Sequence, residues 1–298
     1  MPPATPGVRP TPIIDAHAHA WRRWPYQPPV PDPASRGHLD QLRFEMAASG
    51  VDEAVIVCAA IGGNDDNLAE VADDLDRHPI DHGRFHLVAD VDCPWHSTHH
   101  RPGAADRVRR AADRFELAGI THYVGEIDDG WLDSAEGDAF VAAIVERDLI
   151  LSLSAGVAWH GSVARLARRH PSLPVLMHHL GLARAAVPTD EEVDSVVRLA
   201  QVPSILVKLS GLHYVATQPW RFPYGASHGL LGRLVDAFGP DRLCWGSDFP
   251  AARAHVTYQQ SLEVIRAEHS GLFGHDGMSA VLGGTADEVL RTRRPVAG

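Results

Sequence analysis

Five polar side chains in this sequence end or follow apolar stretches, and all belong to residue types that hold cations or move protons. They are His17, His19, Glu126, His179 and Asp248. A strand alternates its faces, so His17 and His19, two residues apart, point to the same side at a spacing of about 7 Å. Imidazole and carboxylate groups bind divalent cations and also transfer protons. The pattern predicts a metal site or an acid–base site, provided that the fold brings these residues together.

Asp248 and the pair His178–His179 each leave two interpretations open. A carboxylate at Asp248 can hold a cation and accept a proton from an attacking water, but an aspartate there can also cap the next helix. His178 and His179 are adjacent in the sequence, so the alternation of a strand lets only one of them face the interior. The parity of Val175 and Met177 favours His179, and a buried structural histidine is the alternative.

Two further charged residues lie in apolar surroundings. Glu126 ends an apolar run, where a carboxylate is costly unless it is paired or binds a metal. A structural ion pair and a role in the site are equal alternatives for it. Lys208 lies inside the run 206–209, so it must find a partner or extend its amine to the surface.

Two stretches rich in proline and aromatic residues, 21–33 and 218–225, predict substrate-binding loops. An arginine can clamp a substrate carboxylate through two hydrogen bonds, and a tryptophan can wall a pocket for a sugar or a flat ring. Solvated arginine at the surface is the alternative. The candidate substrate contacts are Trp21, Arg22, Arg23, Trp220 and Arg221.

The elements that must position these residues are strands and helices in alternation. Several of the strand-like runs are continuously apolar, as in parallel strands covered on both faces, and helical periodicity fills the segments between them. Eight β-then-α units predict an α/β fold, a closed (β/α)₈ barrel, in which chemistry is found where the strands end. The eight runs are 13–17, 54–59, 85–90, 120–127, 149–153, 174–179, 205–209 and 242–247.

The length of 298 residues suits one such barrel. We expect a single barrel domain over residues 12–298, after a disordered Pro-rich lead-in over residues 1–11. Two capping-box sequences, which begin at Thr189 and Thr257, predict helix starts. Gly50 and Gly119 precede strand-like runs, as glycines that end helices do.

Composition narrows the class of partner. A formal net charge of −11 argues against nucleic acid or an anionic membrane, and no apolar run reaches the length of a membrane span. Three scattered cysteines do not form a disulfide framework, which favours the cytoplasm. Nucleotide-binding glycine loops and the serine-hydrolase elbow are absent from the sequence. We therefore expect a small-molecule substrate, with a homodimer as the common default.

Four motifs in order carry a resemblance to a known family. They are Asp15-Ala16-His17-Ala18-His19, His179-Leu180-Gly181, Val207-Lys208-Leu209-Ser210-Gly211 and Trp245-Gly246-Ser247-Asp248-Phe249-Pro250. Together they resemble the amidohydrolase superfamily, and within it the amidohydrolase-2 branch, which includes sugar lactonases and the pyrone-dicarboxylate lactonase. The resemblance spans roughly residues 12 to 292.

The resemblance implies a distorted (β/α)₈ barrel and hydrolysis by a water held at the carboxyl face of that barrel. It assigns His17, His19, His179 and Asp248 to the site, with Asp248 as general base and ligand, and with the histidines binding metal or polarising a carbonyl. Residues 151–156 lack the histidine that many members place after strand five, and Glu126 stands where binuclear members have a lysine. His178 also stands where lactonase-like members often have aspartate.

These departures argue against a binuclear centre. They leave a single zinc or manganese, held by His17, His19, Glu126 or His179, and Asp248, or action without metal. The leading hypothesis is a hydrolase of a small lactone, derived from a sugar or a dicarboxylate, in which Asp248 activates water. The second is a metal-dependent decarboxylase of a carboxylated ring, against which Ser154 speaks. The third is a barrel that binds a ligand without turnover.

Overall fold

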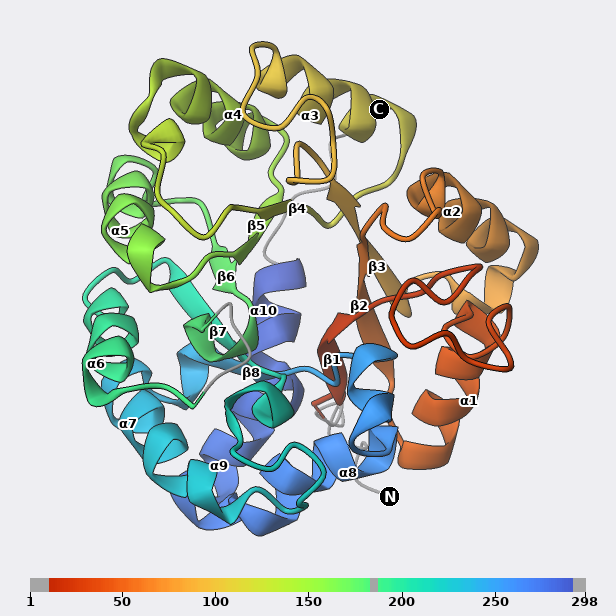
Figure 1. The fold of residues 1–298 in the computed structure, drawn as a ribbon, viewed down its shortest axis with the longest axis vertical. Coiled ribbons are helices and arrows are strands. Elements are labelled where there is room, and N and C mark those ends of the chain that lie inside the picture. The colour runs from red at the N-terminus through yellow and green to blue at the C-terminus, as the bar shows by residue number, and fades with distance from the viewer. Residues whose placement is uncertain (1–10, 183–186, 292–298) are drawn as a thin grey trace, which may run out of the picture.

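Eight parallel strands surround a common axis in the computed structural model, which describes residues 11–182 and 187–291 (Figure 1). Each strand pairs with the next in chain order, and helices form the outer ring, so the predicted (β/α)₈ barrel is confirmed. The strands are β1 (Ile14–Ala18), β2 (Glu53–Cys58), β3 (Phe85–Asp90), β4 (Gly119–Tyr123), β5 (Ile150–Ser154), β6 (Val175–Met177), β7 (Ile205–Leu209) and β8 (Leu243–Trp245).

The α-helices follow the strands and cover the barrel from outside, apart from the last one. They are α1 (Leu39–Ser49), α2 (Asn67–Arg77), α3 (Ala104–Arg114), α4 (Ala135–Glu146), α5 (His160–Arg169), α6 (Asp190–Leu199), α7 (His228–Phe238), α8 (Tyr258–Glu263), α9 (Gly274–Ser279) and α10 (Thr285–Arg291). Within the described residues, none of the helices has both the length and the apolar composition needed to span a bilayer.

The barrel interior is a small apolar layer closed at one end by α10. Figure 1 shows α10 inside the ring of strands, and its residue Ala286 packs in the same cluster as Ile14 and Leu176. Ile14 begins β1, so α10 covers the amino end of the barrel. The opposite, carboxyl end stays available for chemistry, as this architecture requires.

The seam between β8 and β1 is closed by the segment that follows β8. Ala18 and Phe249 form an isolated parallel bridge. The backbone N–H of Asp248 donates to the carbonyl oxygen of His17 at 2.8 Å, and that of His19 donates to Phe249 at 2.7 Å. The first and last strand motifs of the sequence are therefore neighbours in space.

Local signals in the sequence mostly predicted the element boundaries. Thr189 and Thr257 both form the predicted capping boxes, and Gly50 ends α1 in the left-handed region with a φ of 70°. Gly119 differs, because it opens β4 instead of ending a helix. A Cβ on Gly119 would lie 2.2 Å from the Ile150 side chain, so close packing of β4 against β5 requires glycine there.

The predicted domain boundaries stay a prediction. The expected lead-in over residues 1–11 falls almost wholly outside the described residues, which begin at Thr11, and residues 292–298 lie outside them as well.

Candidate active site

His17, His19 and Asp248 meet where β1 and β8 end. His17 Nε2 lies 3.7 Å and His19 Nε2 4.0 Å from Asp248 Oδ1, and all three residues are buried. The pairing of β1 with β2 shifts register between Asp15 and Ala18, and this irregularity changes which residues of β1 face inward. Ile14 packs in the interior below the shift, and the two histidines point inward above it.

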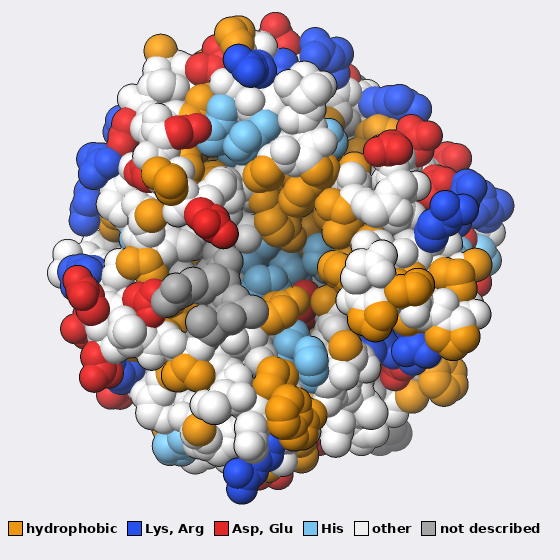
Figure 2. Space-filling model, viewed as in Figure 1, with side chains coloured by type: hydrophobic (Ala, Val, Ile, Leu, Met, Phe, Trp, Pro, Cys, Tyr) orange, Lys and Arg blue, Asp and Glu red, His pale blue; other side chains and the backbone are white. Residues whose placement is uncertain are grey.

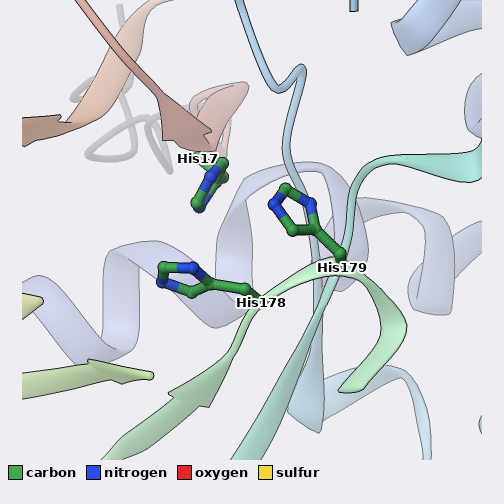
Figure 3. A group of neighbouring side chains, drawn as sticks. All are labelled: His17, His178 and His179. Atoms are coloured by element: carbon green, nitrogen blue, oxygen red, sulfur yellow. The ribbon is translucent and has the colours of Figure 1, made fainter. Parts of the chain in front are cut away.

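His178 and His179 both join this cluster. His179 Nε2 lies 4.0 Å from Asp248 Oδ1, and the rings of His178 and His179 lie 4.4 and 4.7 Å from that of His17. Figure 3 shows the three rings pointing toward one another from β1 and from the end of β6. The prediction that only one of the pair faces the interior is wrong. Because β6 ends at Met177 and His179 has a φ of 43°, the alternation of a strand no longer applies there.

The donor atoms around Asp248 fit a divalent cation. Nε2 atoms of three histidines surround one carboxylate oxygen, and two ligands of a tetrahedral zinc are about 3.4 Å apart. His17 Nε2 is buried and has no hydrogen-bond partner among the residues that the structure describes. His19 Nδ1 donates to the Val57 carbonyl at 2.7 Å, which leaves its Nε2 as a lone-pair donor.

Asp248 is held in a strained and dry position. Its φ is 55°, an uncommon value for a residue with a side chain. Burial raises its pKa to about 7, although the hydroxyl of Tyr214 donates to Oδ2 at 2.8 Å and lowers it. His213 Nε2 lies 3.9 Å from the same oxygen. A carboxyl with a pKa near 7 is suited to proton transfer at neutral pH.

A buried chain of polar contacts supports the histidines from below. Lys208 Nζ donates to Ser152 Oγ at 2.7 Å and lies 3.3 Å from His17 Nδ1. Ser152 Oγ lies 2.7 Å from His178 Nε2. Burial lowers the pKa of Lys208 to about 8. The chain therefore links strands β1, β5 and β7 beneath the cluster.

Asp15 fixes the backbone on which the cluster is built. Its carboxylate accepts hydrogen bonds from the backbone N–H of Ser247 at 2.8 Å, from that of His17 at 3.1 Å and from the Tyr258 hydroxyl at 2.9 Å. Burial raises the pKa of Asp15 to about 6. This side chain is fully enclosed, so it orients β1 against β8.

The structure does not bring Glu126 to the cluster. The strand was expected to continue to residue 127, but β4 ends at Tyr123 and Glu126 is exposed in the loop beyond it. The groups of ligand atoms found in the described residues do not include it. The expectation that Glu126 is a metal ligand is therefore wrong, whereas His179 does lie beside Asp248.

The candidate substrate contacts are spread over both loops. Trp21 is buried, stacks on His19 at 4.6 Å and donates to the Ala59 carbonyl, so it supports a histidine of the cluster. Arg22 pairs with Glu70 at 2.7 Å, on the side of α2. The side chains of the remaining three candidates are exposed. They are Arg23, Trp220, which is 70 % exposed, and Arg221.

Sequence reasoning missed Ser152 and Tyr214 and gave Lys208 no place in the site. A charge inside an apolar strand was the signal for Lys208. Tyr214 follows β7 at the carboxyl face, where the barrel rule applies equally. Ser152 gave no signal, because serine is ordinary in a strand. Figure 2 shows that histidine side chains lie in the hollow at the centre of this face, with hydrophobic side chains around its rim.

Comparison with known proteins places this geometry in context. The family model described as Amidohydrolase matches residues 14–292. L-fucono-1,5-lactonase of Burkholderia ambifaria is 28% identical, over 95% of this chain and 96% of its own length. The 4-sulfomuconolactone hydrolase of Hydrogenophaga intermedia is 26% identical, over 82% of this chain and 76% of its own length.

Solved structures share the fold. An amidohydrolase from Burkholderia multivorans with bound zinc superposes with a TM-score of 0.73 at 21% identity, covering 94% of this chain and 99% of its own. A 5-carboxyvanillate decarboxylase from Sphingomonas paucimobilis superposes with a TM-score of 0.63 at 15% identity, with the same coverage.

Proposed function

Because this chain belongs to the amidohydrolase family, we propose that it is a hydrolase that opens a lactone ring, with Asp248 as the general base. The observation that carries the proposal is the position of Asp248 Oδ1, which lies within 4.0 Å of an Nε2 atom of His17, His19 and His179. The curated relatives are lactonases, which supports an ester bond as the target.

The reaction needs one proton to move twice. Asp248 accepts a proton from water as the oxygen of that water adds to the lactone carbonyl carbon. The ring C–O bond then breaks, and the same proton passes from Asp248 to the ring oxygen, which leaves as an alcohol. The product is the open hydroxy acid. Tyr214 donates to Oδ2, so it orients the carboxyl.

His17, His19, His179 and Asp248 would hold a divalent metal through the atoms that already converge. When bound, such an ion supplies polarisation of the carbonyl and a lower pKa for the water. Three imidazole nitrogens favour zinc over manganese, which prefers oxygen ligands. The zinc in the Burkholderia multivorans structure supports this choice. Action without metal is the alternative.

Neutral hydroxyls near the general base favour a polyhydroxylated lactone as substrate. Tyr26 and Tyr123 are partly exposed residues, and the nearby charge of Asp248 adds to the effect of desolvation in raising their pKa values. Both phenols therefore stay protonated and can donate to sugar hydroxyls. Arg23, Trp220 and Arg221 remain our candidates for contacts with substrate at the rim.

The test is hydrolysis of a panel of aldono-1,5-lactones, with L-fucono-1,5-lactone and 4-sulfomuconolactone included. We expect turnover well above the spontaneous rate, reduced by about 10²–10⁴-fold in Asp248→Asn. Full activity in that variant would contradict the role of Asp248, and inactivity on the whole panel would contradict the reaction class.

A decarboxylase is the second candidate, favoured by the fold shared with 5-carboxyvanillate decarboxylase. Carbon dioxide release from a carboxylated ring, abolished by a chelator, would support it. The cytoplasmic location and the absence of nucleic-acid binding are also proposals, and they rest on composition. The homodimer is a proposal that rests on the common default for soluble proteins. Light scattering on purified protein tests the last of these.

A further inference from the structure

Three histidines form a second cluster at the rim of the barrel. His99 and His100 belong to the loop between β3 and α3, and His122 lies on β4. Their ligand atoms lie within 4.8 Å of one another, and the group shares no residue with the groups around His17. Figure 2 shows histidine side chains gathered beside α3 and α4, apart from those in the central hollow.

Hydrogen bonds determine which ring nitrogen carries the proton in each of these histidines. His122 Nδ1 lies 3.0 Å from the carbonyl oxygen of Val91, and His99 Nδ1 lies 2.6 Å from that of Asp92. A carbonyl oxygen only accepts, so both Nδ1 atoms must donate. Each neutral ring then has its lone pair on Nε2.

His100 has the same tautomer for a related reason. Its Nδ1 lies 2.6 Å from Asp129 Oδ2. The other carboxylate oxygen, Oδ1, accepts from the backbone N–H of Trp131 at 2.9 Å, and hydrogen bonds from both partners favour the ionised form. An ionised carboxylate accepts only, so His100 Nδ1 also donates and its Nε2 carries a lone pair.

The Nε2 atoms of His100 and His122 lie only 3.2 Å apart. Two lone pairs at this distance repel each other unless a positive charge lies between them. A metal ion removes the repulsion without a proton.

We propose that His99, His100 and His122 form a zinc-binding site, separate from the central cluster, through their three Nε2 atoms. The spacing of 3.2 Å between two of these atoms matches two ligands of one tetrahedral zinc, which are about 3.4 Å apart. Imidazole nitrogen is a preferred ligand of zinc, and three histidines leave the fourth position for water or another small ligand.

The surroundings hold the three rings in place, as the outer contacts of metal ligands do. Trp131 stacks on His100 at 4.3 Å with its ring nearly parallel, and His99 stacks on His100 at 3.7 Å. Arg107 makes two hydrogen bonds of 2.7 Å to the carboxylate of Asp92, whose carbonyl accepts from His99. A zinc ion here would fasten the loop after β3 to strand β4.

The first test measures zinc per chain after stripping with a chelator, reloading and dialysis. The variants are His99→Gln and His100→Gln, and His96→Gln is the control, because His96 belongs to the same loop but pairs with Asp90. We expect both variants to hold one zinc ion fewer per chain than the wild type and the control. Equal zinc content in all four proteins would overturn the proposal.

The second test separates loss of the site from loss of the fold. Without metal, wild type and variants should melt within a few degrees of each other. Added zinc should raise the melting temperature of the wild type by more than that of either variant, because binding to the folded state stabilises it. An anomalous diffraction peak at the zinc edge between the three rings is the decisive observation, and its absence at saturating zinc would end the proposal. None of these readouts depends on lactone hydrolysis.

Discussion

Asp248 and His17 are joined by a backbone hydrogen bond of 2.8 Å, while their side chains face each other at 3.7 Å. The bond that closes the seam of the barrel therefore also sets the distance between the general base and the first histidine. Movement of either strand end along the seam would change both the backbone hydrogen bond and the distance between the two side chains.

Gly246 lies against His17, and a Cβ there would be 2.7 Å from His17 Cβ and 3.0 Å from its backbone nitrogen. We expect Gly246→Ala to lower kcat by at least tenfold and to cost about 1–3 kcal/mol of unfolding free energy, because the strands must separate. Gly229→Ala is the matched control, since a Cβ on that α7 residue meets no atom within 4 Å. Kinetics and urea denaturation measure both effects, and equal behaviour of the two variants would contradict this account of the seam.

Asp248→Asn should make the metal-free protein more stable at pH 8. Burial raises the pKa of Asp248 to about 7, whereas that of an unfolded aspartate is about 3.9. Between these values the folded state binds more protons than the unfolded state, so the wild type loses stability as pH rises through the window, by roughly 1.4 kcal/mol for each pKa unit of the shift. Asparagine does not titrate, so the variant does not lose stability in this way. The difference in stability between the variant and the wild type should therefore vanish near pH 4. Melting curves with chelator at pH 4 and pH 8 test this, and an Asn variant less stable at pH 8 would refute it.

The pH profile should show whether a metal acts at the centre. In chelated enzyme, kcat/KM should fall as pH drops below about 7, because Asp248 becomes protonated and cannot accept a proton. A bound cation favours the charged carboxylate, so zinc should move this fall to lower pH. A profile that is identical with and without zinc would indicate that no metal binds beside Asp248.

Tyr214→Phe removes the hydroxyl that donates to Asp248 Oδ2. That hydrogen bond lowers the pKa of Asp248, so its loss should raise the pKa and move the acid limb of kcat/KM to higher pH. Tyr224→Phe is the control, because the Tyr224 hydroxyl donates to the carbonyl of Pro219 instead. A uniform loss of activity without a shift of the limb would show that Tyr214 acts otherwise.

Lys208→Met keeps a long side chain but removes the amine between Ser152 and His17. We expect kcat to fall by about 10–100-fold, as for other groups that orient metal ligands. The unfolding free energy should fall little or rise, because a buried amine is costly. Ser152→Ala removes the contact between Ser152 and His178 but keeps the contact between Lys208 and His17. We therefore expect a smaller fall in kcat for this variant. Unchanged kcat in both variants would show that the chain of contacts has no part in catalysis.

The barrel could be predicted from the spacing of apolar residues along the sequence, because that spacing indicates which faces of strands and helices are buried. Parallel strands and the helices that cover them are both buried in this way. The same spacing does not indicate where a strand stops. Glu126 was misplaced because β4 ends at Tyr123, and both His178 and His179 reach the centre because the chain turns after Met177. The points at which β4 and β6 end depend on tertiary packing, and the spacing of apolar residues does not predict that packing.

The contacts between particular side chains could not be predicted from the sequence either. Trp21 was expected to meet substrate, yet its stacking on His19 depends on the path of the whole loop after β1. Lys208 signalled its need for a partner, but Ser152, on a strand two places away, gave no matching signal.

The hydrogen bond between Asp15 and Ser247 joins residues 232 positions apart. When the first seven strands have been synthesised, His17 and His19 are already part of the chain. The segment that aligns them and supplies the carboxylate has not yet been made. Synthesis proceeds from the N-terminus, so activity can arise only when translation is nearly finished. Nascent or prematurely terminated chains would therefore carry no hydrolytic activity, whatever part of the barrel they had already folded.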